Sequence, residues 1–124
     1  MPTISTPYKV TFNVDSLGTE LSVSGEIDTS SETSPKTVLT PTSGYKLDTR
    51  NVYLSTDATS GEIEAKFPAS NILLGKLYAA KQTMVTLQQI RFTGAKNEPI
   101  KIYWSGLSTG AKIFYCIRYK EVEA

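Results

Sequence analysis

The residues best suited to chemistry in this chain are a few carboxylates, because the sequence contains no histidine. Without an imidazole, Ser-His-Asp triads, histidine-ligated zinc and imidazole acid–base catalysis are excluded. Glu62 and Glu64 alternate along an extended segment, so both project from one face, as a pair of glycosidase carboxylates would. Lys66 continues the same alternation. The pattern therefore predicts a solvated charged stripe in place of a catalytic pair.

Two further positions offer weak chemical candidates. Cys116 is the only cysteine, and with no histidine to activate it we expect a small packed side chain and no nucleophile. Asp57 and Glu62 flank the oxygen-rich segment 59–61 and form a weak candidate for a calcium site. The segment lacks EF-hand spacing, and calcium takes six to eight oxygens, so a plain loop is favoured. We expect no cofactor and no enzymatic activity.

Composition and charge narrow the function classes further. The chain has 124 residues, 40% hydrophobic and 20% charged, which suits one folded domain. A net charge of +1 predicts neither a nucleic-acid partner nor binding to an anionic membrane. No apolar run approaches the roughly 20 residues of a membrane span, and the N-terminal residues lack the pattern of a secretion signal. A single cysteine indicates a reducing site of synthesis, which leaves open later release within a virus particle.

The elements that must position these residues are predicted to be β-strands. In the C-terminal segment 111–120, apolar and aromatic residues alternate with a second set that contains Phe114 and Cys116. A period of two is that of a strand. Because both faces carry apolar groups, we expect this strand to be central and covered on two sides. Segment 99–104 pairs with it as a preceding strand, and 62–67 is the clearest amphipathic strand.

The N-terminal region follows a different organisation. Residues 8–14 and 21–27 alternate around the turn-rich segment 15–19, which predicts a β-hairpin. The polar segment 28–35 is rich in Ser and Thr and shows no periodicity, so it is the best linker candidate. We therefore expect an N-terminal hairpin arm with its linker over 1–35, followed by a sandwich over 36–124.

Residues 70–89 allow two interpretations. Leu73, Leu77, Ala80, Met84 and Leu87 follow a helical stripe, which would make the domain α+β. Gly75 disfavours a helix. We favour two strands, 72–79 and 84–93, with a turn near 81–83 and a bulge at 88–89, because the surrounding segments are all β. The predicted fold is thus an all-β antiparallel sandwich of jelly-roll type.

Aromatic residues are the main surface signal. Seven tyrosines and one tryptophan are available for contacts with proteins or sugars. Tyr115 and Tyr119 fall on one face of the last strand, and Tyr103 is expected nearby on the preceding one. These three form the predicted oligomer contact, although they can instead pack between the sheets with their hydroxyls at the rim. Trp104 is the predicted platform for a ligand, with a sugar as the leading class.

The order of the segments resembles the small jelly-roll modules of virion and tail-associated proteins in bacteriophages, archaeal viruses and prophages. The matching segments are 39–44 (LTPTSG), 52–56 (VYLST), 60–67 (SGEIEAKF), 76–78 (KLY), 94–102 and 117–122 (IRYKEV). The resemblance covers 36–122 and concerns layout, without a diagnostic motif, so no functional residue is carried over. It implies a trimeric or otherwise symmetric assembly that decorates a particle or recognises a host surface.

These observations predict a non-enzymatic structural or host-attachment module of a virus-like assembly. Its expected partners are further copies of itself, with a trimer favoured, and capsid proteins, tail proteins or host-surface glycans. Its expected location is the virion, or the cell interior before release. The alternatives are a carbohydrate-binding module that uses exposed aromatics, and an adaptor that pairs through a sheet edge.

Overall fold

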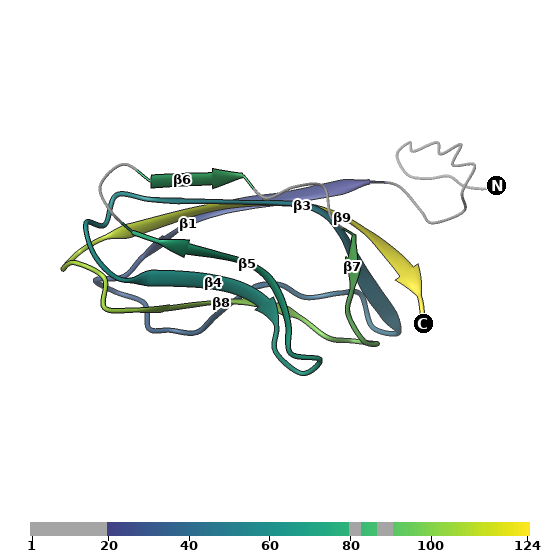
Figure 1. Cartoon of the computed structure of the whole chain (residues 1–124). Helices are drawn as coiled ribbons and strands as arrows, with labels where there is room; N and C mark the ends of the chain where they lie inside the picture. The colour runs from purple at the N-terminus through teal and green to yellow at the C-terminus, as the bar shows by residue number, and fades with distance from the viewer. Residues whose placement is uncertain (1–19, 80–82, 87–90) are drawn as a thin grey trace.

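The chain folds into two antiparallel β-sheets that pack face to face as two layers (Figure 1). This is seen in a computed structural model that describes residues 20–79, 83–86 and 91–124. The strands are β1 (Leu21–Asp28), β2 (Lys36–Leu39), β3 (Tyr45–Thr56), β4 (Glu62–Phe67), β5 (Ile72–Tyr78), β6 (Thr83–Thr86), β7 (Phe92–Thr93), β8 (Ile100–Ser105) and β9 (Lys112–Glu123).

The strand order is that of a jelly roll. One sheet runs β1-β9-β3-β6, and β7 pairs with β3 further along the edge that β6 occupies; the other sheet runs β2-β8-β4-β5. Successive strands mostly change sheet, so that strands distant in sequence, such as β1 and β9, become neighbours. This exchange between two layers of antiparallel strands defines the jelly-roll class. The predicted all-β jelly-roll sandwich is therefore confirmed.

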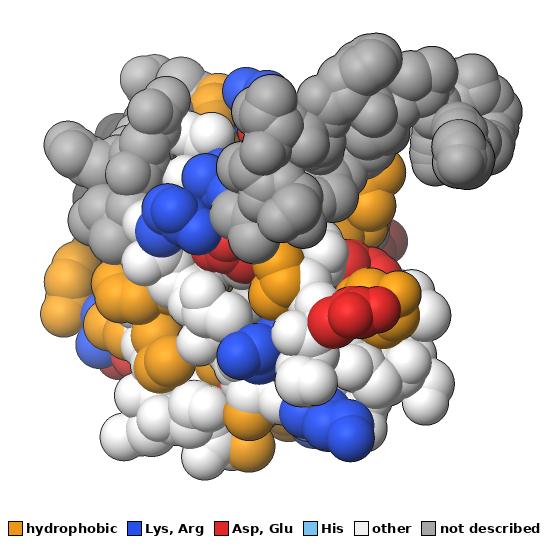
Figure 2. Space-filling view, turned by 90° about the vertical axis from the view of Figure 1, so that its right-hand side faces the viewer, with side chains coloured by type: hydrophobic (Ala, Val, Ile, Leu, Met, Phe, Trp, Pro, Cys, Tyr) orange, Lys and Arg blue, Asp and Glu red, His pale blue; other side chains and the backbone are white. Residues whose placement is uncertain are grey.

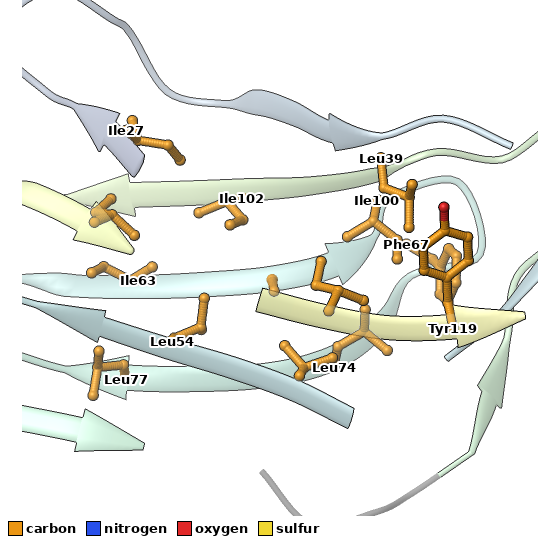
Figure 3. Close-up of a cluster of buried hydrophobic side chains, with 14 of the residues drawn as sticks. Ile27, Leu39, Leu54, Ile63, Phe67, Leu74, Leu77, Ile100, Ile102 and Tyr119 are labelled. Carbon is orange, nitrogen blue, oxygen red and sulfur yellow. The ribbon is translucent and has the colours of Figure 1, made fainter. Parts of the chain in front are cut away.

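The core is built by alternation along these strands. On β4, Ile63, Ala65 and Phe67 are fully buried while their neighbours face outward, the period expected of a strand with one wet face. The other strands contribute in the same way, and Figure 3 shows the side chains of both layers directed into the space between them. The fully buried side chains of this cluster are Ile27, Leu47, Leu54, Ile63, Ala65, Phe67, Ile100, Ile102, Ile113 and Ile117.

The last strand has the predicted central place in its sheet but not the predicted cover. β9 lies between β1 and β3 and pairs with both along most of its length. Its inner face, with Ile113 and Ile117, is buried in the core. Its outer face is not covered by another layer, since Phe114 is 44% exposed. The expectation that both faces are covered is therefore wrong, because a two-layer sandwich buries only one face of each sheet.

The segment with two interpretations is β where it is described. β5 occupies Ile72–Tyr78 and pairs with β4, and β6 and β7 pair with β3. The helical alternative is therefore wrong for these residues. Pairing with β4 outweighs the helical spacing of the leucines, because β5 forms the edge strand of its sheet beside β4. The turn predicted at 81–83 lies mostly outside the described residues, as does the bulge at 88–89.

The N-terminal boundary also differs from the expectation. The sequence predicts an arm that includes residues 21–27, whereas the structure places Leu21–Asp28 in the sandwich as β1, paired with β9 from end to end. Its inward residues, including Ile27, complete the core, and this burial explains why β1 joins the sheet. Residues 8–19 of the predicted hairpin lie outside the described residues, so the hairpin stays a prediction.

The predicted linker 28–35 is a tethered connection between the sheets. The Thr29 hydroxyl donates to the Ala111 carbonyl at 2.7 Å, and the Ser34 hydroxyl accepts from the Trp104 backbone N–H at 2.9 Å. The Lys36 ammonium also pairs with Glu32 within the segment. These bonds fix the path from β1 in one sheet to β2 in the other.

A close approach of two loops fixes one end of the sandwich. Gly61 has a φ of 101°, and a side chain there would meet the Ser105 carbonyl oxygen and the Gly106 carbonyl carbon at 2.6 Å. Only glycine satisfies both conditions at low cost. The loop before β4 therefore lies directly against the loop after β8.

A buried carboxylate joins two loops elsewhere in the sandwich. Glu98 is 4% exposed and accepts hydrogen bonds from the Ser70 backbone N–H at 2.6 Å, the Ser70 hydroxyl at 2.6 Å and the Ala95 N–H at 2.8 Å. Burial alone would raise the pKa of Glu98, but these hydrogen bonds outweigh it and lower the pKa below its ordinary value. The carboxylate thus ties the β4–β5 turn to the segment between β7 and β8.

Candidate functional site

The outer face of the β2-β8-β4-β5 sheet carries a connected set of ion pairs and cation–π contacts. We call it the Glu–Lys face and define it by the outward side chains of β4, β5 and β8: Glu62, Glu64, Lys66, Leu73, Lys76, Tyr78 and Tyr103. Strand register places Glu64 opposite Lys76 on one side and opposite Tyr103 on the other. The alternation that buries Ile63 and Ala65 therefore also lines up these polar side chains.

Ion pairs connect the side chains of the Glu–Lys face. The Lys76 ammonium lies 2.7 Å from Glu62 Oε1 and 3.2 Å from Glu64 Oε2, and Lys66 Nζ lies 3.9 Å from Glu64 Oε1. The hydrogen bonds to Glu62 and then to Glu64 raise the pKa of Lys76 above its ordinary value. Lys76 therefore stands as a cation between the two carboxylates. The predicted charged stripe is confirmed, and it includes a residue of β5 that sequence spacing did not identify.

Two of the lysines also cover tyrosine rings. Lys66 Nζ lies 4.6 Å from the centroid of Tyr103, and Lys76 Nζ lies 5.1 Å from that of Tyr78, both within cation–π range. Tyr78 is 67% exposed and Leu73, also on β5, is 47% exposed. The Glu–Lys face therefore combines paired charges with large accessible apolar surface.

A hollow of about 360 Å³ adjoins this face. Trp104 forms part of its wall and also packs partly against the hydrophobic core, so it is neither fully buried nor fully exposed. Aromatic rings beside carboxylates and an ammonium can stack on a ligand while accepting and donating hydrogen bonds. The residues that line this Trp104 hollow are Ser34, Glu62, Glu64, Lys76, Tyr103, Trp104 and Ser105.

The three tyrosines of the predicted oligomer contact do not form one surface. Tyr119 is buried in the core, and Tyr115 packs against the core on the same inner face of β9. Tyr115 lies over Gly25, its partner in the register, where an added side chain would meet the Tyr115 hydroxyl at 2.6 Å. Tyr103 belongs to the outer face of the other sheet. Alternation placed Tyr115 and Tyr119 together, but it could not tell the inner face from the outer one.

Asp57 and Glu62, the weak metal candidates, both bind other groups of the protein. Asp57 Oδ1 accepts from the Lys112 backbone N–H at 2.8 Å, while Glu62 pairs with Lys76. Among residues 20–79, 83–86 and 91–124, no group of three or more potential metal ligands occurs. Asp57 therefore serves the loop in which it lies by holding the start of β9.

A second charged cluster lies on the β1-β9-β3-β6 sheet and was not found from the sequence. Asp48 is only 2% exposed, and its Oδ2 accepts from Arg91 Nη2 at 2.8 Å and from Arg50 Nη2 at 3.4 Å. Oδ1 lies 3.4 Å from the Thr93 hydroxyl on β7. The pairing joins β3 to residues more than 40 positions later, so no local spacing signals it.

On the face shown in Figure 2, basic, acidic and hydrophobic side chains of the described residues are interspersed and do not form one large charged area. The described residues contain no helix with the length and hydropathy needed to cross a bilayer.

Comparison with solved structures supports the fold. A chain of the cyanophage Pam1 capsid asymmetric unit matches with a TM-score of 0.53 and 14% identity, over 97% of this chain and 99% of that chain. A chain of the virus-like particle of the giant freshwater prawn Macrobrachium rosenbergii extra small virus gives a TM-score of 0.44 and 13% identity, over 97% and 94%. No protein-family model and no curated protein matches the chain. The first comparison shows that the jelly-roll architecture is shared along the whole of both chains.

Proposed function

We propose that this chain is a non-enzymatic structural subunit of a virus-like particle. The observation that carries the proposal is the jelly-roll strand order together with its full-length match to a chain of the cyanophage Pam1 capsid asymmetric unit. At 14% identity the match concerns the fold, and the step from fold to role is an inference from where such folds are used. The location that follows is the virion, or the producing cell before release.

The residue inventory supports a structural role. Histidine is absent from the sequence, and the described carboxylates singled out as catalytic or metal candidates are engaged by Lys76 or by a backbone N–H. A subunit of a shell or a decoration layer needs broad, rigid outer faces, and a two-layer sandwich supplies them.

We place the contact between copies on the Glu–Lys face. Tyr78 and Leu73 provide exposed apolar area, and Tyr103 is the one residue of the predicted contact that remains on an outer face. Exposed aromatic side chains are enriched at protein interfaces, where charged groups belong to the polar rim, and closed symmetric assemblies are the common result. A second and a third copy of this chain are the proposed occupants; capsid or tail proteins are the further partners.

Sedimentation velocity over a wide concentration range tests the assembly. We expect the wild-type chain to sediment as a closed oligomer, a trimer in the favoured case. The double variant L73S/Y78S should sediment as a monomer, because it removes the apolar area of the face. The matched control is Phe114→Ser, which removes a large exposed side chain (44%) from the other sheet and should leave the oligomer intact.

A wild-type monomer at millimolar concentration would contradict self-assembly through any face. The structural role has a separate test in the proteome of particles purified from the source culture. We expect the chain at a fixed ratio to the major shell protein, and its absence from purified particles would overturn the role.

The N-terminal residues before β1 are proposed to attach the module to a neighbouring subunit or to the particle. The support is the alternating pattern of residues 8–14, which predicts a strand. The two sheets formed by the described residues do not include this segment. A chain that begins at Glu20 should keep the oligomer of the full chain but lose association with particles. Retained association would contradict the attachment role.

A second candidate function, glycan binding, is favoured by the Trp104 hollow. Its rings stand beside the carboxylates of Glu62 and Glu64 and the ammonium of Lys76, which can accept from and donate to sugar hydroxyls. A glycan array with the wild-type chain tests it, and Tyr103→Ala and Glu64→Gln should each lower the signal. An array without binding at millimolar sugar would exclude this function and leave the structural role untouched.

A further inference from the structure

A second hollow lies at one end of the sandwich, where the β1–β2 connection meets the loop that joins β8 to β9. We call it the loop hollow, and it measures about 370 Å³. None of its lining residues carries a charge, and five of them carry a hydroxyl group. The lining residues are Thr29, Ser30, Trp104, Ser105, Gly106, Leu107, Ser108, Thr109 and Gly110. The wall of the loop hollow is thus neutral and rich in hydrogen-bonding groups.

The loop hollow and the Trp104 hollow meet at the end of β8. Trp104 and Ser105, the last two residues of that strand, line both hollows. The β1–β2 connection also borders both, through Ser34 at the Trp104 hollow and through Thr29 and Ser30 at the loop hollow. At about 360 and 370 Å³, each hollow lies near the lower limit of the roughly 300–1,000 Å³ of small-molecule pockets. Two adjoining hollows of this size suit a ligand longer than either one would hold.

The hydroxyl groups of the loop hollow retain hydrogen-bonding capacity. Ser105 and Thr109 are exposed, and their side chains make no hydrogen bond within the described part of the chain. The hydroxyls of Thr29 and Ser30 already donate, to a backbone carbonyl and to a carboxylate, so their oxygens can still accept. Ser108 Oγ accepts from a backbone N–H at 3.1 Å and can still donate. The loop hollow therefore offers both donors and acceptors to a ligand.

We infer that the ligand of the Trp104 hollow is an uncharged oligosaccharide that extends past Trp104 into the loop hollow, an inference that rests on the glycan-binding function proposed above. Sugar hydroxyls donate and accept, as the wall of the loop hollow does. Trp104 and Leu107 are partly buried against the core, so they offer fixed apolar surface to the C–H face of a sugar ring. A charged group would find no counter-charge in the loop hollow, and Glu62 and Glu64 are already paired with lysines. An uncharged chain of sugars fits both hollows.

The experiment is a titration of the full chain followed by tryptophan fluorescence. Trp104 is the only tryptophan in the sequence, so the signal comes from the junction of the two hollows. The probes are maltose, cellobiose and N,N′-diacetylchitobiose, each compared with the tetrasaccharide of the same series. We expect the Kd to fall about tenfold or more from disaccharide to tetrasaccharide in at least one series, because the loop hollow adds two or more hydrogen bonds.

Variants separate the two hollows. Thr109→Ala should weaken tetrasaccharide binding about fivefold, the scale of one hydrogen bond, and leave the disaccharide in the Trp104 hollow unaffected. The matched control is Thr59→Ala, which removes an exposed hydroxyl from the neighbouring loop but lines neither hollow, and it should change neither affinity. Glu64→Gln, in the Trp104 hollow alone, should weaken both probes.

Equal affinities for disaccharide and tetrasaccharide in all three series would overturn the extension into the loop hollow and leave glycan binding at the Trp104 hollow intact. Equal tetrasaccharide affinities in Thr109→Ala and Thr59→Ala would do the same. If no probe gives a saturable change of fluorescence, the extension is overturned, and the glycan array decides separately whether the Trp104 hollow binds another sugar.

Discussion

The two outer faces of the sandwich both carry ion pairs, but they bury the carboxylates to different depths. On the Glu–Lys face, Glu62 and Glu64 keep side-chain exposures of 41% and 28% beside Lys76. On the opposite sheet, Asp48 is 2% exposed beneath Arg50 and Arg91. An exposed pair gains little because water and salt screen it, whereas a buried carboxylate depends on its partners for all of its solvation.

The two clusters of ion pairs are expected to have different roles, one in stabilising the fold and the other in recognition. The Asp48 cluster holds β3 against the segment of β7, so its ion pairs belong to the architecture. The pairs of the Glu–Lys face lie over strands that the β4–β5 and β4–β8 ladders already join, so we expect the fold to tolerate their exchange. We therefore expect stability to reside in the first cluster and recognition in the second.

The sharpest test of this difference is Asp48→Asn. The variant leaves two guanidinium groups without their carboxylate, and we expect the free energy of unfolding to fall by about 3 kcal/mol. Urea denaturation followed by tryptophan fluorescence measures it. Glu64→Gln on the other sheet is the matched control and should change stability by less than about 1 kcal/mol. Equal losses in the two variants would remove the distinction between the faces.

Glu98 extends the comparison to a buried carboxylate whose partners are N–H and O–H donors and not cations. Glu98→Gln should cost about 2 kcal/mol, because the carboxylate accepts charge-assisted hydrogen bonds from Ser70 and Ala95. Urea unfolding at neutral pH gives this value. An effect as small as that of Glu64→Gln would show that burial does not decide the cost.

The same residue predicts an acid dependence of stability. Because the pKa of Glu98 is lowered in the folded chain, its contribution is complete above the unfolded-state value of 4.5 and is lost as the pH falls through the folded-state pKa. The wild-type chain should therefore lose more stability on acidification below about pH 4.5 than Glu98→Gln does. Ser70→Ala, which keeps the carboxylate, should retain most of the slope. Parallel curves for the wild type and Glu98→Gln would contradict the assignment.

A smaller effect is expected for Lys76→Met. The ammonium pairs with Glu62 and Glu64 in an exposed setting, so its removal should lower the free energy of unfolding much less than Asp48→Asn does. The difference from the wild type should shrink further in 1 M sodium chloride, where screening acts over a few ångströms. The loss in Asp48→Asn should persist in the same salt. A loss of stability in Lys76→Met that does not change with salt would contradict the difference in screening between the two clusters.

The smallest effect concerns the contact of Lys66 with the ring of Tyr103. A double-mutant cycle of Lys66→Met and Tyr103→Leu should give a coupling free energy of about 0.5 kcal/mol, the scale of an exposed cation–π pair. Urea unfolding of the four proteins measures it. A coupling of zero would mean that the lysine covers the ring without attraction.

Much of the fold follows from local alternation. Segment 62–67 reads as a strand because apolar and charged residues alternate without interruption, and β4 occupies those residues. Near β5, strands are preferred to a helix on other grounds, because the surrounding segments are all β and Gly75 disfavours a helix. The period of two is a property of the backbone, so it is visible in any window of a few residues.

What alternation could not supply is which face turns inward and which segments meet. Tyr115 and Tyr119 share a face by period, but their burial depends on the sheet that covers them. Residues 45–50 of β3 do not continue the alternation of segment 52–56, because the register shifts between Thr49 and Asn51. The partners of Asp48 are brought together by pairing of distant strands, and neither residue type nor spacing marks them in advance.

The loop contact at Gly61 has a consequence for engineering this scaffold. Because the backbone of Gly61 touches that of Gly106, both loops would have to move to admit even one methyl group there. Gly110 lies in the same loop as Gly106, between β8 and β9. An added side chain at Gly110 would nevertheless meet nothing within 4 Å. Foreign epitopes are therefore best grafted next to Gly110, where the chain can bulge outward while the neighbouring loops stay locked.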